Sequence, residues 1–192
     1  MIRAGETLVN TISGETITFV ETAADTGGEY TLIEVSVAPG GGVPMAHVHP
    51  YQSETFEVLE GRLSMKAGRD KLVAEPGDVV TVTPGQVHKF WNDGDTPVRF
   101  RCTVAPAGEF ERFIETMFAL AADGKLNKRG MPGSIRLAVI ANAHFDDSRA
   151  PYIPAWMQKA GLVTGAVLGR MVGYEPTYDR KAPAGELVPA TA

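Results

Sequence analysis

The amino-acid sequence predicts a mainly β protein, an antiparallel barrel or double-sheet sandwich followed by C-terminal α-helices. About eight short segments before residue 106 alternate apolar and polar residues, and turns rich in Gly, Pro and Asp separate them. Beyond that point the apolar residues recur every three or four positions, which is the helical period. The 192 residues suit one domain of ordinary size. We therefore expect a barrel in residues 1–105 and, in residues 106–192, a helical extension packed on the barrel or on a partner protomer.

The expected strands rest on an alternation with a period of two, which places every second side chain on the same face of a sheet. The alternation is clearest in residues 98–104, where two arginines and a threonine separate the apolar residues. Residues 62–67 and 71–74 are expected to form a hairpin across the turn between them. The full set of expected strands is 15–20, 30–37, 54–59, 62–67, 71–74, 79–83, 86–92 and 98–104.

Three helices are expected after the barrel. Residues 109–122 carry a stripe of Phe and Met side chains that is suited to packing on the barrel. A proline precedes each of the other two helices, which are expected in residues 134–145 and 155–172. His144, near the end of the second helix, is expected to be an exposed residue that interacts with the helix C-terminus.

The last helix is apolar on nearly all sides. Its bulky side chains fall on one stripe, and small residues recur every fourth position on the roughly opposite side. The bulky stripe comprises Trp156, Ala160, Val163, Val167 and Met171, and the small residues are Gly161, Gly165, Gly169 and Gly173. Each interior glycine costs a helix on the order of 1 kcal/mol relative to alanine, so packing has to compensate. We expect one face to pack within the protomer and the glycine face to meet a second protomer in a two-fold homodimer, with burial within one chain as the alternative.

Charge and cysteine content narrow the functional classes. The net charge is −5 and no basic cluster is present, so we expect no nucleic-acid partner. No run approaches the roughly 18 apolar residues of a membrane span. Lys159 and Arg170 also place charges within the apolar last helix, which argues against membrane contact. The single cysteine, Cys102, excludes an internal disulfide, and the N-terminus MIRAGETLVN has neither a basic nor an apolar signal region. We therefore expect a cytoplasmic protein in which Cys102 is a small buried hydrophobe.

Three of the four histidines and one carboxylate fall in two neighbouring segments. His47 and His49 are two residues apart in an extended context, so both imidazoles would point to the same side. Glu54 opens the next strand, and His88 lies in the segment 77–92. Convergence of these four side chains would give nitrogen and oxygen donors without a thiolate, which suits a divalent first-row metal. An isolated pair of this kind is more often a surface feature, so the prediction depends on all four residues together.

These two segments resemble the two sequence motifs of the cupin family. Residues 41–61 read G-x5-H-x-H-x4-E-x6-G, as in the first motif, while Thr83 stands where the second motif has proline. The second motif is otherwise matched at Gly77, Gly85, His88 and Asn92. The resemblance covers roughly residues 30–105 and implies a jelly-roll barrel that binds one divalent metal through His47, His49, Glu54 and His88. Iron or manganese is the first expectation, and nickel or zinc the second.

Four protein ligands on a metal that prefers six leave about two positions for water, dioxygen or a chelating substrate. Such a site is compatible with an oxygenase-like oxidoreductase or isomerase acting on a small organic molecule, with a non-catalytic small-molecule binder, or with a structural role. No catalytic residue is assigned, because Glu54 is placed as a ligand before it is considered as a base. A largely apolar ligand pocket is expected beside the metal, with two polar residues that orient the ligand. Its expected residues are Phe56, Met65, Phe90 and Cys102, together with Gln86 and Asn92.

Overall fold

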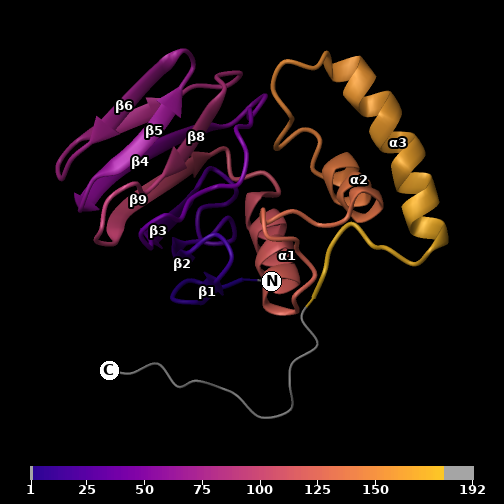
Figure 1. The fold of residues 1–192 in the computed structure, drawn as a ribbon, viewed down its shortest axis with the longest axis horizontal. Coiled ribbons are helices and arrows are strands. Elements are labelled where there is room, and N and C mark those ends of the chain that lie inside the picture. The colour runs from indigo at the N-terminus through magenta and orange to yellow at the C-terminus, as the bar shows by residue number, and fades with distance from the viewer. Residues whose placement is uncertain (1, 180–192) are drawn as a thin grey trace, which may run out of the picture.

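The computed structural model describes residues 2–179 as two antiparallel sheets followed by helices (Figure 1). The larger sheet has the strand order β1-β2-β3-β9-β4-β7, and the smaller sheet has the order β6-β5-β8. The strands are β1 Thr7–Asn10, β2 Glu15–Glu21, β3 Thr31–Val37, β4 Ser53–Glu60, β5 Leu63–Ala67, β6 Asp70–Ala74, β7 Val79–Val82, β8 His88–Trp91 and β9 Val98–Ala105. The helices are α1 Phe110–Ala122, α2 Ser134–Ala143 and α3 Ala155–Met171. The predicted fold class, an antiparallel double-sheet barrel with C-terminal helices, is confirmed.

One strand was not expected from the sequence. β1 is four residues long and pairs with β2, at one end of the larger sheet. Its central residues, Leu8 and Val9, are both apolar and adjacent, so they break the alternation on which the other strands were predicted. The other strands lie close to their expected ranges. β8 begins at His88, two residues later than expected. The reason is a turn before it, in which the backbone N–H of Gln86 donates to the carbonyl oxygen of Thr83 at 3.0 Å.

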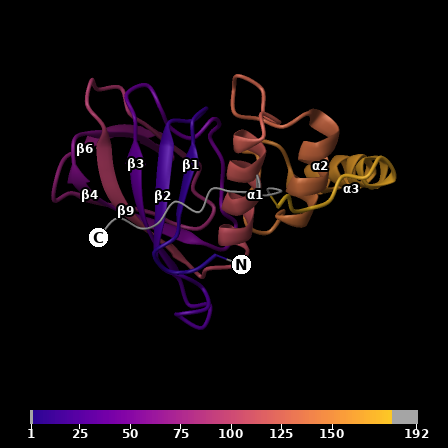
Figure 2. The same ribbon diagram turned by 90° about the horizontal axis from the view of Figure 1, so that it is seen from below.

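Aromatic side chains from both sheets meet in the core of the barrel. Phe100 of β9 is fully buried, and its ring centroid lies 5.7 Å from that of Phe56 and 5.2 Å from that of Phe90. α1 adds Phe110 and Phe118 to the same apolar core, as its Phe and Met stripe predicted. Figures 1 and 2 show α1 lying between the barrel and the pair formed by α2 and α3. The first helix therefore joins the barrel to the rest of the extension.

α3 packs against α2 through its glycines. A Cβ atom built on Gly165 would lie 2.6 Å from the Cβ atom of Ala138, and one built on Gly169 would collide with the side chain of Val139. The prediction that the glycine face meets a second protomer is therefore wrong. The missing side chains let the two helices of one chain approach each other closely, and the bulky stripe points away from α2. Trp156, at the start of that stripe, is 73% exposed.

The helical extension was predicted to run to the end of the chain, and its last part, residues 180–192, lies outside the described residues. Within residues 2–179, none of the helices has both the length and the apolar character required to cross a membrane. The division of the chain into two parts near residue 105 stays a prediction.

Candidate metal centre

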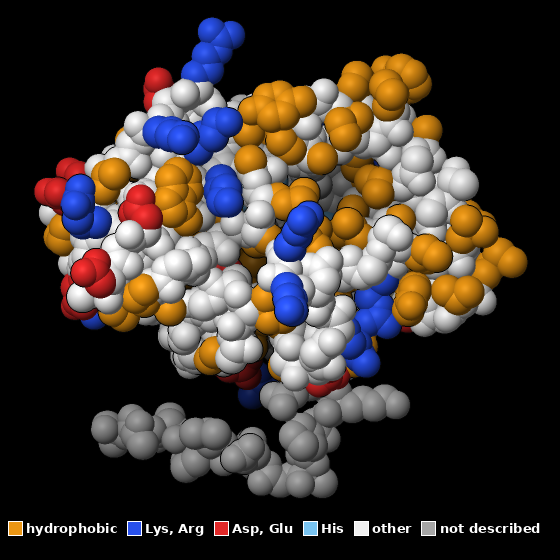
Figure 3. Space-filling view, in the orientation of Figure 1, with side chains coloured by type: hydrophobic (Ala, Val, Ile, Leu, Met, Phe, Trp, Pro, Cys, Tyr) orange, Lys and Arg blue, Asp and Glu red, His pale blue; other side chains and the backbone are white. Residues whose placement is uncertain are grey.

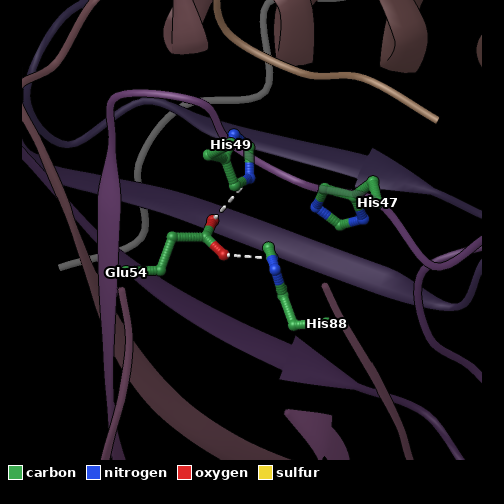
Figure 4. Close-up of side chains that lie close together, drawn as sticks. All are labelled: His47, His49, Glu54 and His88. Carbon is green, nitrogen blue, oxygen red and sulfur yellow. Dashed lines mark ion pairs between the residues drawn. The ribbon is translucent and has the colours of Figure 1, made fainter. Parts of the chain in front are cut away.

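Four side chains from three segments lie close together inside the barrel (Figure 4). His47 and His49 lie in the connection between β3 and β4, Glu54 lies in β4, and His88 begins β8. The backbones of His47 and His88 exchange two hydrogen bonds, with N···O distances of 3.0 and 2.9 Å. Each of the four residues offers one ligand atom, and these atoms all lie within 4.8 Å of one another. The structure thus brings together the four residues that the sequence singled out.

A glycine lets the connection that carries His47 and His49 run close to β8. Gly42 forms a backbone bridge with Trp91 and has a φ angle of 144°. A Cβ atom at this position would lie 2.6 Å from the carbonyl oxygen of Phe90, closer than side chains approach a backbone. The close contact holds the two histidine-bearing segments side by side.

A backbone carbonyl group holds the Nδ1 atom of each imidazole. In His47 and His88, Nδ1 lies 3.2 and 3.1 Å from the carbonyl oxygen of the residue two positions earlier. In His49, Nδ1 contacts the carbonyl oxygen of Asp147. A carbonyl oxygen can only accept a hydrogen bond, so in these pairs each Nδ1 carries the proton. The lone pair of a neutral imidazole then lies on Nε2, the atom that is left to bind a metal.

The carboxylate of Glu54 faces two of these imidazoles. Its Oε2 lies 2.7 Å from Nε2 of His88, and its Oε1 lies 3.6 Å from Nε2 of His49. Burial would raise the pKa of Glu54, but the contact with His88 and the neighbouring imidazoles lower the pKa to about 2. Burial and the nearby His88 lower the pKa of His47 to about 4. Burial alone would lower the pKa of His88, but its interaction with Glu54 outweighs this effect and raises it. At neutral pH the cluster therefore holds an ionised carboxylate beside a neutral His47.

The donor set fits a divalent first-row metal. The Nε2 atom of His49 is buried and lies 3.6 Å from the carboxylate of Glu54, beyond hydrogen-bond distance, so within residues 2–179 it has no hydrogen-bond partner. Buried polar atoms in proteins nearly always have a partner. A cation that accepted the lone pair of this atom would satisfy it, and three imidazoles with one carboxylate are ligands that such ions prefer.

Residues 33–104 match the family model of the cupin domain. These residues of the chain therefore form a cupin domain. An uncharacterized protein of Methanocaldococcus jannaschii is 30% identical over 80 residues, which are 42% of this chain and 63% of that protein. Quercetin 2,3-dioxygenase of Bacillus subtilis is 30% identical over 93 residues, which are 48% of this chain and 27% of the dioxygenase. The chain therefore spans less than two thirds of the length of either relative.

Solved structures are also similar to the cupin barrel. One is an uncharacterized conserved protein with a double-stranded β-helix domain from Klebsiella pneumoniae, with a TM-score of 0.46 and 24% sequence identity. The similarity covers 56% of this chain and 90% of the Klebsiella chain.

The loop after α2 touches the candidate metal centre of the barrel. Besides the contact of Asp147 with His49, the backbones of Val48 and Arg149 exchange two hydrogen bonds, at 3.1 and 2.9 Å. The carboxylate of Asp147 in turn accepts a 3.0 Å hydrogen bond from the backbone N–H of Glu109, just before α1. The helical extension therefore helps to orient one of the four candidate ligands. No sequence motif marks this loop, so the contact could not be predicted from residue order.

The buried side chain of His144 packs against the same loop. It is 4% exposed, its Nδ1 lies 3.6 Å from Oδ2 of Asp147, and its ring meets that of Phe113 edge-on at 5.4 Å. The prediction of an exposed His144 is therefore wrong, because the chain after α2 folds back against α1 and covers it.

Replacing Asp147 with alanine is expected to weaken metal binding about 10- to 100-fold, the usual effect of losing a group that orients a metal ligand. The variant loses the bond to Glu109 that fixes the loop, so the carbonyl group facing His49 becomes less well placed. Competition with a chromophoric chelator would measure the affinity. Asp146→Ala is the matched control, because the adjacent Asp146 side chain is 74% exposed and pairs with Arg149 at the surface. Equal affinities for the two variants would contradict this role of the loop.

The four apolar residues expected in a ligand pocket lie in the buried core on the same side as the cluster. They are two register pairs, Phe56 with Cys102 and Met65 with Phe90. Phe56 follows Glu54 by two positions along β4, and Phe90 follows His88 by two along β8, so these residues share the interior faces of their strands. Burial, together with the charge of Glu54, raises the pKa of the Cys102 thiol well above its usual range. Cys102 is thus the buried, unreactive residue that was expected.

The two polar residues expected in the pocket differ in their surroundings. Nδ2 of Asn92 donates to the carbonyl oxygens of Val37 and Thr96, and its Oδ1 accepts from the backbone N–H of Gly94, all at 2.9 Å. The amide of Asn92 thus binds the backbone around β8, and the role of orienting a ligand stays a prediction for Asn92. Oε1 of Gln86 accepts from the backbone N–H of Thr83 at 3.1 Å, and a pocket role for Gln86 stays a prediction.

Proposed function

We propose that His47, His49, Glu54 and His88 bind one divalent metal ion, iron or manganese before nickel or zinc, and that the protein is an oxygenase-like oxidoreductase acting on a small organic molecule. The observation that carries this proposal is the set of three imidazoles, each with Nδ1 bound to a carbonyl group, gathered around one carboxylate. The local similarity to quercetin 2,3-dioxygenase supports the class of reaction. The functional unit would be the barrel in residues 1–105, with residues 106–192 as an extension that supports it.

When bound, the ion would supply Lewis-acid chemistry and, for iron or manganese, electron exchange with dioxygen. Glu54 would offset part of its positive charge and, with the imidazoles, fix its place. His88 would give up the proton that it shares with Glu54, since a metal ligand has to be deprotonated. The buried rings of Phe56 and Phe90 would keep water away from the interior side of the site.

Oxygen uptake by protein loaded separately with each of the four metals tests this proposal. We expect the iron or manganese form to consume dioxygen only when a diol, flavonol or diketone is present, and the zinc form to consume none. Tight binding of these compounds without turnover in any metal form would instead identify a non-catalytic binder. An isomerised product without oxygen uptake would identify an isomerase, and either result would overturn the oxygenase assignment.

Replacing Phe90 with leucine is expected to change KM for the active compound about tenfold or more, while the metal content stays at the wild-type value. The reason is that Phe90 shares the interior face of β8 with His88 but is not a candidate ligand. Lys89→Ala is the control, since Lys89 points to the opposite face of the same strand. Steady-state kinetics and metal analysis of both variants would measure the two effects. An unchanged KM in the leucine variant would place the substrate elsewhere.

A further inference from the structure

The outward face of α3 and the loop before it form an unusually apolar surface. Nine large hydrophobic side chains that are more than a third exposed lie between residues 152 and 172. They are Tyr152, Ile153, Trp156, Met157, Val163, Val167, Leu168, Met171 and Val172. Figure 3 shows hydrophobic side chains gathered over this part of the molecule. We call these nine residues the α3 surface.

The sequence of α3 explains why this surface is uninterrupted. At 3.6 residues per turn, Ala166 and Gly169 face α2, and the opposite half of the helix carries the bulky residues. Thr164 is the one polar residue on that half, and Arg170 lies at its margin, whereas Lys159 is on the α2 side, where its Nζ donates to the carbonyl oxygen of Asn142. α3 contains no Asp or Glu. Both faces of α3 are therefore apolar enough to pack against another surface, and α2 covers only one of these faces.

The size of the α3 surface is that of a protein interface. Tyr152 and Trp156 are 79% and 73% exposed. An aromatic side chain carries about 150–250 Å², so these two alone expose on the order of 300 Å². The largest apolar patch on a typical monomer covers about 300–600 Å², so these two side chains alone reach the lower limit of that range. With the seven other side chains the surface approaches the roughly 800 Å² that each partner contributes to a stable complex.

We propose that the α3 surface binds the same surface of a second copy of this chain, with the two α3 helices antiparallel across a two-fold axis near Val163 and Thr164. In this arrangement Trp156 of one copy lies beside Met171 of the other, and Ala160 lies beside Val167. Large side chains then meet at both ends of the contact, and a small residue faces a branched one between them. The surface is self-complementary, as a two-fold interface requires.

The charges favour a protein partner. Lys159 turns toward α2, where its Nζ donates to the carbonyl oxygen of Asn142 at 3.4 Å, so it does not place a charge on the outward face of α3. A membrane surface is a weaker candidate. Two basic residues give an attraction to anionic lipid of only about 1 kcal/mol each, and the whole chain carries a net charge of −5.

The mass of the full chain in solution tests this inference. Light scattering after gel filtration is expected to give a dimer for the wild type, and a monomer for Val167→Glu and for Leu168→Lys. Both substitutions are at exposed positions, so a wild-type circular dichroism spectrum is expected for each. Val79→Glu, at a 62% exposed position on β7, is the control and should stay dimeric. A monomeric wild type, or a dimer that persists in both α3 variants, would overturn the proposal. A monomer that binds anionic vesicles through Trp156 would also overturn it, and would show that lipid covers this surface.

Discussion

Replacing His49 with alanine should lower the affinity for a divalent metal by more than about 100-fold and leave the barrel folded. Loss of a group that merely orients a ligand costs about 10- to 100-fold, so loss of the ligand itself should cost more. The fold should survive, because the apolar core lies in strand residues such as Val35, Leu63 and Phe100, which are almost completely buried. Isothermal titration with the metal that the wild type prefers would measure the affinity, and circular dichroism would report the fold.

Thr55→Ala provides the control for this experiment. Thr55 adjoins Glu54 in β4, but it contacts Thr81 on the outer side of the sheet at an exposed position. Its loss should leave metal affinity within about twofold of the wild type, since surface substitutions of this kind have small effects. A His49→Ala protein that still bound one equivalent of metal tightly would remove His49 from the ligand set.

Replacing Phe100 with alanine should lower the free energy of unfolding by about 3–5 kcal/mol. Phe100 is fully buried, and its ring packs against those of Phe56 and Phe90, so the cavity that is left cannot fill with water or collapse easily. A domain has about 5–15 kcal/mol of stability in total, so this change removes a large share. Urea denaturation followed by fluorescence would measure it.

Val79→Ala is the matched control for the core prediction. Val79 is 62% exposed at the start of β7, so its truncation should change stability by no more than about 0.5 kcal/mol. A loss below about 1 kcal/mol in Phe100→Ala would mean that the three rings do not form the centre of the core.

The strands and the four candidate ligands could be predicted from the sequence because both depend on local spacing. Alternation in residues 98–104 determines which side chains face inward, and the structure buries Phe100, Cys102 and Val104 accordingly. The spacing of His47, His49 and Glu54, with His88 in a second motif, likewise predicted a cluster that the structure contains. Spacing within one segment can be predicted from residue order alone, because it needs no knowledge of which distant segments pack together.

Contacts between distant segments could not be predicted in the same way. The two faces of α3 were recognised, but residue order alone does not say which of them α2 covers. The answer depends on how closely Gly165 allows Ala138 to approach. Similarly, nothing near His144 in the sequence shows that Phe113 of α1 will cover its ring. The amide of Asn92 matched a motif position, yet its partners include Val37, 55 residues away.

The most direct test of the metal centre is an anomalous difference map from crystals of the metal-loaded protein, recorded on both sides of the metal's absorption edge. We expect one strong peak, within bonding distance of the three imidazole Nε2 atoms of His47, His49 and His88 and of the carboxylate of Glu54. The absorption edge would also identify the ion, and iron or manganese is expected. A fully loaded crystal with no peak among these four residues, or with its peak elsewhere on the chain, would contradict the account.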